Sequence, residues 1–314
     1  MTRPTITPTD QHAINAVLHA VRQASDAICD RWSLTLLLAL IQGDRRFKDF
    51  EARTGQATRV LTTRLRALEA IGLIVRMPYQ MHPPRHEYRL TAMGEAASEI
   101  LLQMARWEQR WVDGDTPAGS LGHARCGMQL VLELRCTACG ELVTAREIDW
   151  KVSRAQMQDV PEKQTVHRRS TVSGDGDPVR HVLGPTLDIF GDKWGIEILI
   201  CAFFRIRRFS DFRQCTGIST NILADRLERL VAAQILRRSE EPSRQAEYRL
   251  TERGIDLYGV PAVIKKWADA WLGMPYRSRV QPLHRTCGSI FFPLTTCVHC
   301  GDMVLAEDVI FPTR

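Results

Sequence analysis

The chain has 314 residues, of which 44% are hydrophobic and 25% are charged, and its formal net charge is +6. This composition is typical of a globular protein of about two domains, and it excludes collagen-like, disordered and rod-like coiled-coil chains. No apolar run approaches the roughly 20 residues that span a membrane, and the first residues do not resemble a signal peptide, so we expect a cytoplasmic protein with no membrane partner. The mild positive charge is compatible with a polyanionic partner.

Hydrophobic periodicity predicts a defined order of elements in the first third of the chain. The predicted helices cover residues 15–30, 32–42, 46–54 and 58–71, two strands cover 73–77 and 86–91, and a long helix covers 92–111. Helices followed by a hairpin and a further helix form a winged helix-turn-helix. In that fold the helix before the hairpin enters the major groove of DNA, and the hairpin reaches the minor groove or the backbone.

The second half of the chain repeats the first. The segment RRFKDF at residues 45–50 recurs as RRFSDF at 207–212, an offset of 162. The segment EYRLT at residues 87–91 recurs at 247–251, an offset of 160. Many further matches occur in the same order, so we interpret the chain as a tandem duplication with a second winged helix.

Arginine and small polar residues lie on the outward face of each predicted recognition helix and on the hairpins. Arginine can bind guanine or phosphate, and threonine can contact either. A solvated surface is the alternative for such a face, but its position directly before a basic hairpin favours DNA. The candidate DNA-binding residues are Arg46, Thr58, Arg59, Thr62, Thr63, Arg66, Arg76 and Arg85 in the first copy, and Arg208, Ser219, Thr220, Asn221, Arg238 and Arg244 in the second.

The two recognition helices differ in charge. Residues 57–72 contain three Arg and one Glu, a net charge of 3 − 1 = +2, whereas residues 219–234 contain two Arg, one Asp and one Glu, a net charge of 2 − 2 = 0. Phosphate attraction dominates DNA affinity, so we expect the first copy to contribute more of it. Asn221 can read adenine, so the second copy can contribute sequence preference.

Each copy also contains two ligand pairs of the kind that bind zinc. His-x-x-Cys is followed after nine residues by Cys-x-x-Cys, and a glycine follows each pair. One His and three Cys fill a closed tetrahedral zinc site, and the strand-like residues between the pairs are expected to form a hairpin that brings them together. The predicted ligands are His123, Cys126, Cys136 and Cys139 in the first copy and His284, Cys287, Cys297 and Cys300 in the second.

Cys-x-x-Cys is also a redox motif, which normally opens a helix after a strand. The following glycine and the matching His-x-x-Cys pair upstream favour zinc. The sequence therefore predicts two structural Zn²⁺ ions per chain, one in each ribbon, with no open position for catalysis.

Several ordered motifs resemble the HxlR-type winged-helix transcription regulators. They are RRFxDF, LxxRLxxLxxxGLI and PPRxEYxLTxxG in the first copy, with GDKW and TERG in the second. The resemblance covers roughly residues 20–110 and 182–271. It implies a bacterial-type regulator, usually a homodimer built through terminal helices, and it allows a small-molecule effector.

Together these observations predict a mainly α protein with small β-sheets (α+β) that is not an enzyme. We expect a winged helix at residues 1–115, a zinc ribbon at 116–150, a linker at 151–178, a second winged helix at 179–276 and a second ribbon at 277–314. The expected partner is double-stranded promoter DNA, bound by one chain as a pseudo-dimer or by a homodimer. A thiol redox sensor or oxidoreductase, and a protein-interaction module that has lost DNA binding, remain the alternatives.

Overall fold

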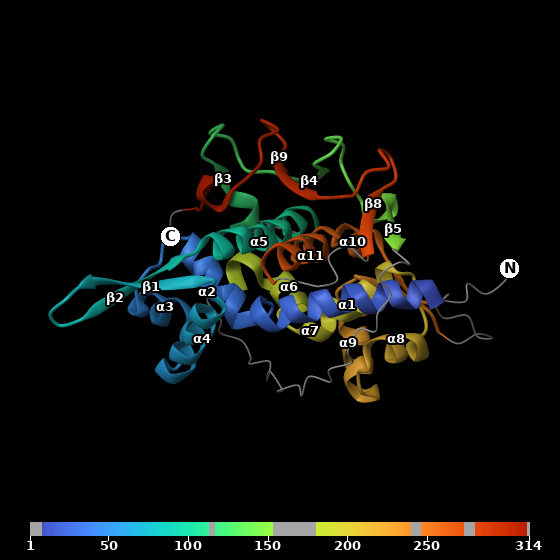
Figure 1. Cartoon of the computed structure of the whole chain (residues 1–314), viewed down its shortest axis with the longest axis horizontal. Coiled ribbons are helices and arrows are strands. Elements are labelled where there is room, and N and C mark those ends of the chain that lie inside the picture. Colours follow the sequence, from blue (N-terminus) through green and yellow to red (C-terminus); the bar gives the residue numbers. More distant parts are fainter. Residues whose placement is uncertain (1–7, 113–116, 153–179, 240–245, 273–279, 313–314) are drawn as a thin grey trace. The chain divides into compact units, whose positions relative to one another are not determined.

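The computed structural model describes residues 8–112, 117–152, 180–239, 246–272 and 280–312 (Figure 1). The predicted linker at 151–178 lies outside these ranges except for its first two residues, which belong to a strand. None of the described helices is long and apolar enough to cross a membrane.

The first copy has the predicted order of elements. They are α1 (Pro8–Ile28), α2 (Arg31–Ile41), α3 (Phe47–Thr54), α4 (Thr58–Ile71), β1 (Ile74–Gln80), β2 (Arg85–Leu90) and α5 (Ala92–Trp111). Helix α2 is almost wholly apolar and buried, and the Asp30 carboxylate caps it by accepting hydrogen bonds from the N–H groups of Trp32 (3.1 Å) and Ser33 (3.2 Å). Helix α4 exposes its polar residues and buries Leu61, Leu65 and Leu68, the stripe expected of an amphipathic helix.

The second copy follows the same plan, except that its first helix is kinked at Leu183 and its last helix is divided in two. Its elements are α6 (Arg180–Phe190), α7 (Lys193–Phe203), α8 (Phe209–Thr216), α9 (Thr220–Ala232), β6 (Leu236–Arg238), β7 (Tyr248–Leu250), α10 (Glu252–Asp256) and α11 (Gly259–Trp271). The single helix α5 of the first copy thus corresponds to two helices, α10 and α11. Pro261 lies near the break and has no N–H group to continue the helical hydrogen bonds.

The sequence motifs that define the repeat contact one another in each winged helix. The N–H of Tyr88 donates to the carbonyl of Arg45 at 2.7 Å, and the N–H of Tyr248 donates to that of Arg207 at 2.7 Å. The Tyr88 ring also meets Phe50 edge-on, with centroids 5.9 Å apart. The RRF segment lies at the start of α3 in the first copy and of α8 in the second, and in both copies its backbone is hydrogen-bonded to the second strand of the wing.

The glycine of the LTxxG motif is required by close packing. A Cβ atom on Gly94 would lie 2.1 Å from the Leu73 carbonyl oxygen, and one on Gly254 would lie 2.2 Å from that of Ile235. The preceding threonine of each motif caps the helix, since the Thr91 hydroxyl accepts from the N–H of Gly94 (3.2 Å). This motif fixes how the wing joins the next helix.

The chain forms two compact units, each made of three segments. Unit 1 comprises the described residues of Met1–Ala24, Arg135–Ser170 and Lys193–Pro293, and unit 2 comprises those of Ser25–Leu134, Thr171–Asp192 and Leu294–Arg314. The second winged helix therefore shares unit 1 with most of α1. The first winged helix shares unit 2 with α6. Each unit combines the winged helix of one copy with the leading helix of the other.

Polar contacts to buried groups hold these helices in place. In unit 1, Arg22 of α1 donates to the Glu197 carboxylate (2.8 Å), whose side chain is 1% exposed, and to the Thr216 carbonyl (3.0 Å). In unit 2, the Glu108 carboxyl of α5 accepts from the N–H (2.9 Å) and hydroxyl (2.6 Å) of Thr186 on α6. A buried carboxyl group needs such partners, so these contacts specify which helix packs against which winged helix.

Short strands follow each winged helix. They are β3 (Gly122–His123), β4 (Leu132–Cys136) and β5 (Ile148–Val152) in the first copy, and β8 (Val280–His284), β9 (Pro293–Cys297) and β10 (Val309–Ile310) in the second. They form the pairs β3–β10, β4–β9 and β5–β8. Each of these strands pairs with a strand of the other copy. The hairpin expected within a ribbon is absent from these pairs, so the sequence-based expectation for the ribbons is corrected here.

The buried carboxyl of Glu108 generates a prediction about stability. Burial raises its pKa from an ordinary 4.5 to about 7, although the two hydrogen bonds from Thr186 oppose the change. A carboxyl group whose pKa is raised by folding binds an additional proton in the folded state. Its stabilising contribution is therefore present below pH ~4.5 and is lost as the pH rises towards 7.

We expect wild type to lose stability between pH 5 and 8 relative to Glu108→Gln, by on the order of 3 kcal/mol. Thermal unfolding across this range measures the difference, and Glu141→Gln, at an exposed carboxyl, is the control. Parallel pH profiles for wild type and Glu108→Gln would contradict the prediction.

Candidate functional site

The Cys and His residues lie on four turns of the same construction, which we call knuckles. Each knuckle begins at His123, Cys136, His284 or Cys297, ends at the glycine four residues later, and carries two ligand-type residues. The glycine N–H donates to the carbonyl of the first ligand residue at 2.8–2.9 Å. All four glycines have positive φ values, from 68° to 76°, a region that glycine adopts without strain.

The knuckles meet in two pairs, one in each unit. His123, Cys126, Cys297 and Cys300 form a cluster in unit 2, and Cys136, Cys139, His284 and Cys287 form a cluster in unit 1. In each cluster the four ligand-type atoms lie within 4.8 Å of one another. Each cluster has the predicted composition of one His and three Cys.

The predicted grouping of the ligands by copy is wrong, because each cluster takes one knuckle from each copy. In unit 2 the N–H of Val298 donates to the Val131 carbonyl (2.9 Å), which places the knuckle at Cys297 beside the one at His123. In unit 1 the N–H of Thr137 donates to the Phe292 carbonyl (3.1 Å), which places the knuckle at Cys136 beside the one at His284. Within a copy, five extended residues of β4 separate the knuckles by ~17 Å of chain, so the strand keeps them apart.

The geometry of both clusters fits a tetrahedral metal ion. In unit 2, His123 Nδ1 lies 3.2 Å from Cys126 Sγ and 3.5 Å from Cys300 Sγ. In unit 1, His284 Nδ1 lies 3.3 Å from Cys139 Sγ and 3.5 Å from Cys287 Sγ. Zinc bound at about 2.0 Å to nitrogen and 2.3 Å to sulfur places these two atoms about 3.5 Å apart.

Both histidines are completely buried, and the Nε2 atom of each has no hydrogen-bond partner among the described residues. The rings therefore turn Nδ1 towards the thiols and leave Nε2 on the protein side. This orientation suits Nδ1 as the metal ligand.

The thiols within a cluster differ in acidity. The Ser289 N–H bonds to the Cys287 thiolate and lowers its pKa to about 6. In Cys139 the Glu141 N–H also favours the thiolate, but burial and the neighbouring thiols outweigh it and raise the pKa. In unit 2 burial opposes ionisation of Cys297, yet the N–H groups of Cys300 and His299 lower its pKa. Adjacent thiolates repel one another, so a cation is the group that allows all three to ionise together.

The candidate DNA-binding residues of the first copy lie in unit 2, on α4, directly before α3 and on the β1–β2 wing. Arg59, Thr63 and Arg66 on α4 are exposed. The hydroxyls of Thr62 and Thr63 donate to the carbonyls of Thr58 (2.7 Å) and Arg59 (2.9 Å), so each keeps acceptor capacity only. Thr58 donates to Glu51 at 2.9 Å.

The wing of the first copy adds further positive charge. Arg76 and Arg85 are exposed on the long β1–β2 hairpin (Figure 1), and the guanidinium of Arg46 lies 4.6 Å from the centre of the Tyr79 ring. Among the described residues, Arg59, Arg66, Arg76 and Arg85 form no ion pair, so their charges remain available to a polyanion.

The equivalent surface of the second copy carries less free charge. Arg226 and Arg229 on α9 both form ion pairs with Asp225, the latter at 3.1 Å. Ser219, Thr220, Asn221 and Arg238 are exposed, and Arg208 is half-buried. Ser219 occupies the N-cap position of α9, but its side chain makes no capping hydrogen bond. The remaining candidate, Arg244, lies outside the described residues.

Comparison with known proteins places both winged helices in one family. The HxlR-like helix-turn-helix family matches residues 27–116 and 189–275. An HTH-type transcriptional regulator of Mycobacterium bovis is 37% identical over 130 residues, covering 40% of this chain and 82% of the relative. The regulator YdeP of Bacillus subtilis is 37% identical over 94 residues, covering 30% of this chain and 73% of YdeP.

Two solved structures are also similar in sequence. The oxidized form of the redox regulator HypR is 36% identical, and the match covers 30% of this chain and 98% of HypR with a TM-score of 0.28. The transcription factor PA1607 is 31% identical, and the match covers 41% of this chain and 91% of that chain with a TM-score of 0.37.

The exchange of knuckles between copies predicts the outcome of two double substitutions. Cys126→Ser with Cys300→Ser removes two ligands from one cluster, so we expect such a chain to bind one Co²⁺ ion. Cys126→Ser with Cys139→Ser removes one ligand from each cluster, so tetrahedral thiolate binding should be abolished at both. Titration of the reduced apo-protein with Co²⁺, followed by thiolate-to-cobalt absorption, counts the sites.

Wild type, expected to bind two ions, is the reference for this titration. Grouping within each copy predicts the reverse result, in which the Cys126/Cys139 variant keeps one site and the Cys126/Cys300 variant keeps none. That result would overturn the assignment of ligands.

Proposed function

Because this chain belongs to the HxlR-like helix-turn-helix family, whose relatives are transcriptional regulators rather than enzymes, we propose that it regulates transcription by occupying promoter DNA with two winged helices in one chain. The observation that carries the proposal is the set of four exposed arginines on α4 and the β1–β2 wing of unit 2 that form no ion pair among the described residues, namely Arg59, Arg66, Arg76 and Arg85. Arginine there can bind phosphate and the edge of guanine.

The tandem arrangement serves as an internal substitute for a dimer. Each winged helix shares a unit with the leading helix of the other copy, which is the kind of exchange expected when terminal helices build a dimer. Two winged helices would then read two half-sites of one operator, about one helical turn apart. The duplicated chain supplies both in a 1:1 ratio.

Two structural Zn²⁺ ions complete the proposal. The eight Cys and His residues supply four protein ligands to each ion, which leaves no position for substrate and gives the metal a structural role. Each ion would join a knuckle of one copy to a knuckle of the other, so binding energy would stabilise the exchanged arrangement. A redox function for the Cys-x-x-Cys pairs has less support, because each pair faces a second His/Cys pair.

The difference between the two DNA-binding surfaces predicts unequal contributions to affinity. Arg59→Ala with Arg76→Ala removes exposed charge from the first copy. Asn221→Ala with Arg238→Ala changes the equivalent positions of the second. We expect the first pair to weaken binding to promoter DNA far more, and to flatten its salt dependence by about one unit of slope for each phosphate that the protein no longer binds.

Fluorescence anisotropy titrations at several salt concentrations, with the upstream DNA of the chain's own gene and with random DNA, make this comparison. Equal or greater damage from the second pair would contradict the proposed asymmetry. Absence of salt-dependent binding by wild type to either DNA would contradict the proposed function.

A further inference from the structure

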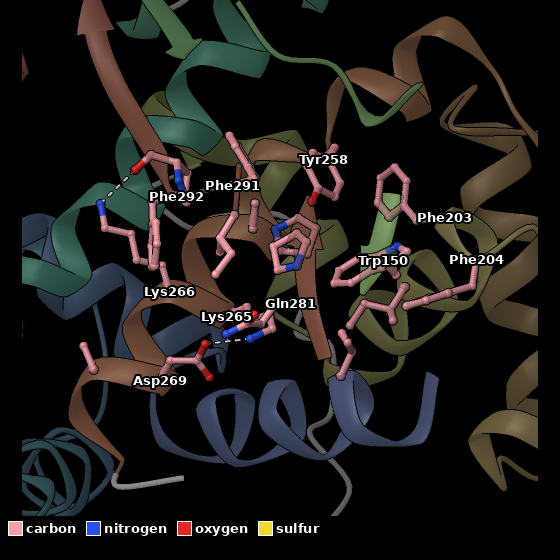
Figure 2. A pocket seen from close by; sticks show the side chains of 18 residues that line it. Trp150, Phe203, Phe204, Tyr258, Lys265, Lys266, Asp269, Gln281, Phe291 and Phe292 are labelled. Carbon is pink, nitrogen blue, oxygen red and sulfur yellow. Dashed lines mark hydrogen bonds and ion pairs between the residues drawn. The ribbon is translucent and has the colours of Figure 1, made fainter. Parts of the chain in front are cut away.

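Unit 1 contains a cavity of about 290 Å³ beside α11 (Figure 2). Its walls are largely aromatic, formed by Trp150, Phe203, Phe204, Tyr258, Phe291 and Phe292. The Trp150 and Phe204 rings stack with centroids 4.8 Å apart, and Tyr258 lies over Phe291 at 6.2 Å with 28° between the ring planes. Such a volume is close to the lower end of small-molecule sites, and flat aromatic walls favour a planar ligand.

The cavity takes its walls from both copies. Trp150 on β5 and Val17 on α1 belong to the first copy, whereas the other residues of the lining belong to the second. All of them lie in unit 1. The cavity therefore depends on the arrangement in which one unit combines elements of both copies.

The charged groups of the lining have partners within the protein. Lys265 Nζ pairs with the Asp269 carboxylate at 2.6 Å. Lys266 Nζ donates to the Pro293 carbonyl at 3.0 Å, and this residue has a further interaction. Figure 2 shows the ion pair and the hydrogen bond at the edge of the aromatic walls. A charged ligand would lose its hydration here without gaining an unpaired counter-charge, so the lining favours an uncharged ligand.

The Tyr258 hydroxyl has no protein partner. The residue is 5% exposed, and among the described residues no group forms a hydrogen bond with its hydroxyl. Burial raises the pKa of Tyr258, so the hydroxyl stays protonated and can donate. In Figure 2 it is directed into the space between the labelled side chains. A buried donor without an acceptor is costly, and an acceptor atom on a ligand would satisfy it.

The first copy provides an internal comparison for the space. The equivalent place in unit 2 holds a cavity of only about 20 Å³. There Leu101 and Leu102 replace Pro261 and Ala262, at the offset of 160. The first copy has the uninterrupted helix α5 here, whereas the second copy has the separate helices α10 and α11. A proline and a small residue therefore leave room that the first copy fills with leucine.

The unpartnered donor is also a feature of the second copy alone. Ser98 replaces Tyr258 at the same offset, and its hydroxyl donates to the Gly94 carbonyl at 3.3 Å within α5. The second copy thus differs from the first at this place in two independent ways, by the open space and by the donor that faces it. Both differences suit a bound ligand.

We propose that the cavity of unit 1 binds a small, uncharged, planar aromatic molecule that carries a hydrogen-bond acceptor, with its ring between the aromatic walls and its acceptor on the Tyr258 hydroxyl. An aryl ketone is the simplest molecule of this class. The inference concerns binding and stands without DNA.

Isothermal titration calorimetry of the full chain with 1-indanone and with indane tests the role of the hydroxyl. The two compounds share one ring system, and indane lacks the carbonyl group. We expect Tyr258→Phe to weaken binding of 1-indanone about five- to tenfold, because the carbonyl is left without a donor, and to leave binding of indane unchanged. Tyr248→Phe, on β7 of the same unit, is the matched control and should change neither affinity.

Two charged compounds with the same ring system test the preference for an uncharged ligand. At neutral pH, 1-aminoindane is a cation and indane-1-carboxylate is an anion. We expect wild type to bind each of them about tenfold more weakly than 1-indanone, or worse, since neither finds an unpaired counter-charge. Binding of either one as tightly as 1-indanone would overturn this preference.

A second variant tests the location. Ala262→Leu introduces the residue of the first copy and should abolish binding of 1-indanone and indane, whereas Ala232→Leu on the exposed face of α9 should not. If Ala262→Leu does not fold, as judged by thermal unfolding, Tyr258→Phe decides alone. No binding of either neutral compound to wild type, an equal effect of Tyr258→Phe on both, or wild-type affinity in a folded Ala262→Leu protein would overturn the proposal.

An effector role for the ligand rests on the proposed function. Phe203 and Phe204 of the cavity wall lie just before the RRF segment, whose backbone is hydrogen-bonded to the wing. A change in promoter DNA affinity on adding 1-indanone to wild type, absent in Ala262→Leu, supports this role. Binding of 1-indanone with no change in DNA affinity overturns the role and leaves the site in place. Absence of DNA binding with and without the compound counts against the proposed function instead.

Discussion

The proposed metal sites depend on one constraint: a knuckle with two ligand-type residues cannot complete a tetrahedral site by itself. Each copy of the repeat supplies two knuckles, separated by an extended strand, and each knuckle finds its second pair of ligands in the other copy. The strand pairs β3–β10, β4–β9 and β5–β8 likewise join a strand of one copy to a strand of the other. The leading helix of each copy also contacts the winged helix of the other copy, through the buried carboxyl groups of Glu197 and Glu108. Each compact unit therefore contains residues of both copies.

Duplication within one chain also allows the copies to diverge. Two identical subunits must carry the same surface and the same core, but two linked copies need not. Here the first copy keeps an exposed arginine surface and a nearly closed core, with a cavity of about 20 Å³. The second copy pairs its helix arginines with Asp225 and opens a cavity of about 290 Å³. The two copies therefore differ both in surface charge and in how completely the core is filled.

The sequence predicts local structure well, because the signals for it are local. The helix limits at residues 58–71 and 92–111 agree with α4 and α5 at both ends, since a glycine ends the first and a capping threonine begins the second. The spacing of the eight ligand residues identifies them, and they lie in two clusters of the predicted composition.

The partners of those residues could not be predicted, because spacing within a copy is the same whether a knuckle pairs with its own copy or with the other. Each His-x-x-Cys knuckle could face the Cys-x-x-Cys knuckle of its own copy or that of the other copy. The pairing of strands that are distant in the sequence determines which of the two it faces. The cavity could not be predicted either. Its signal is present as substitutions between the copies, such as Ala262 for Leu102 and Pro261 for Leu101, but their consequence depends on packing.

The most direct measurement of the central claim is to cut the chain between its copies. A protease site placed within residues 153–179 and cleaved in the folded, zinc-loaded protein yields two fragments, each carrying one copy. If each unit is built from both copies, the fragments remain a 1:1 complex in size-exclusion chromatography and native mass spectrometry, and they separate only in denaturant. Fragments that part under native conditions, each keeping its own metal ion, would contradict the account.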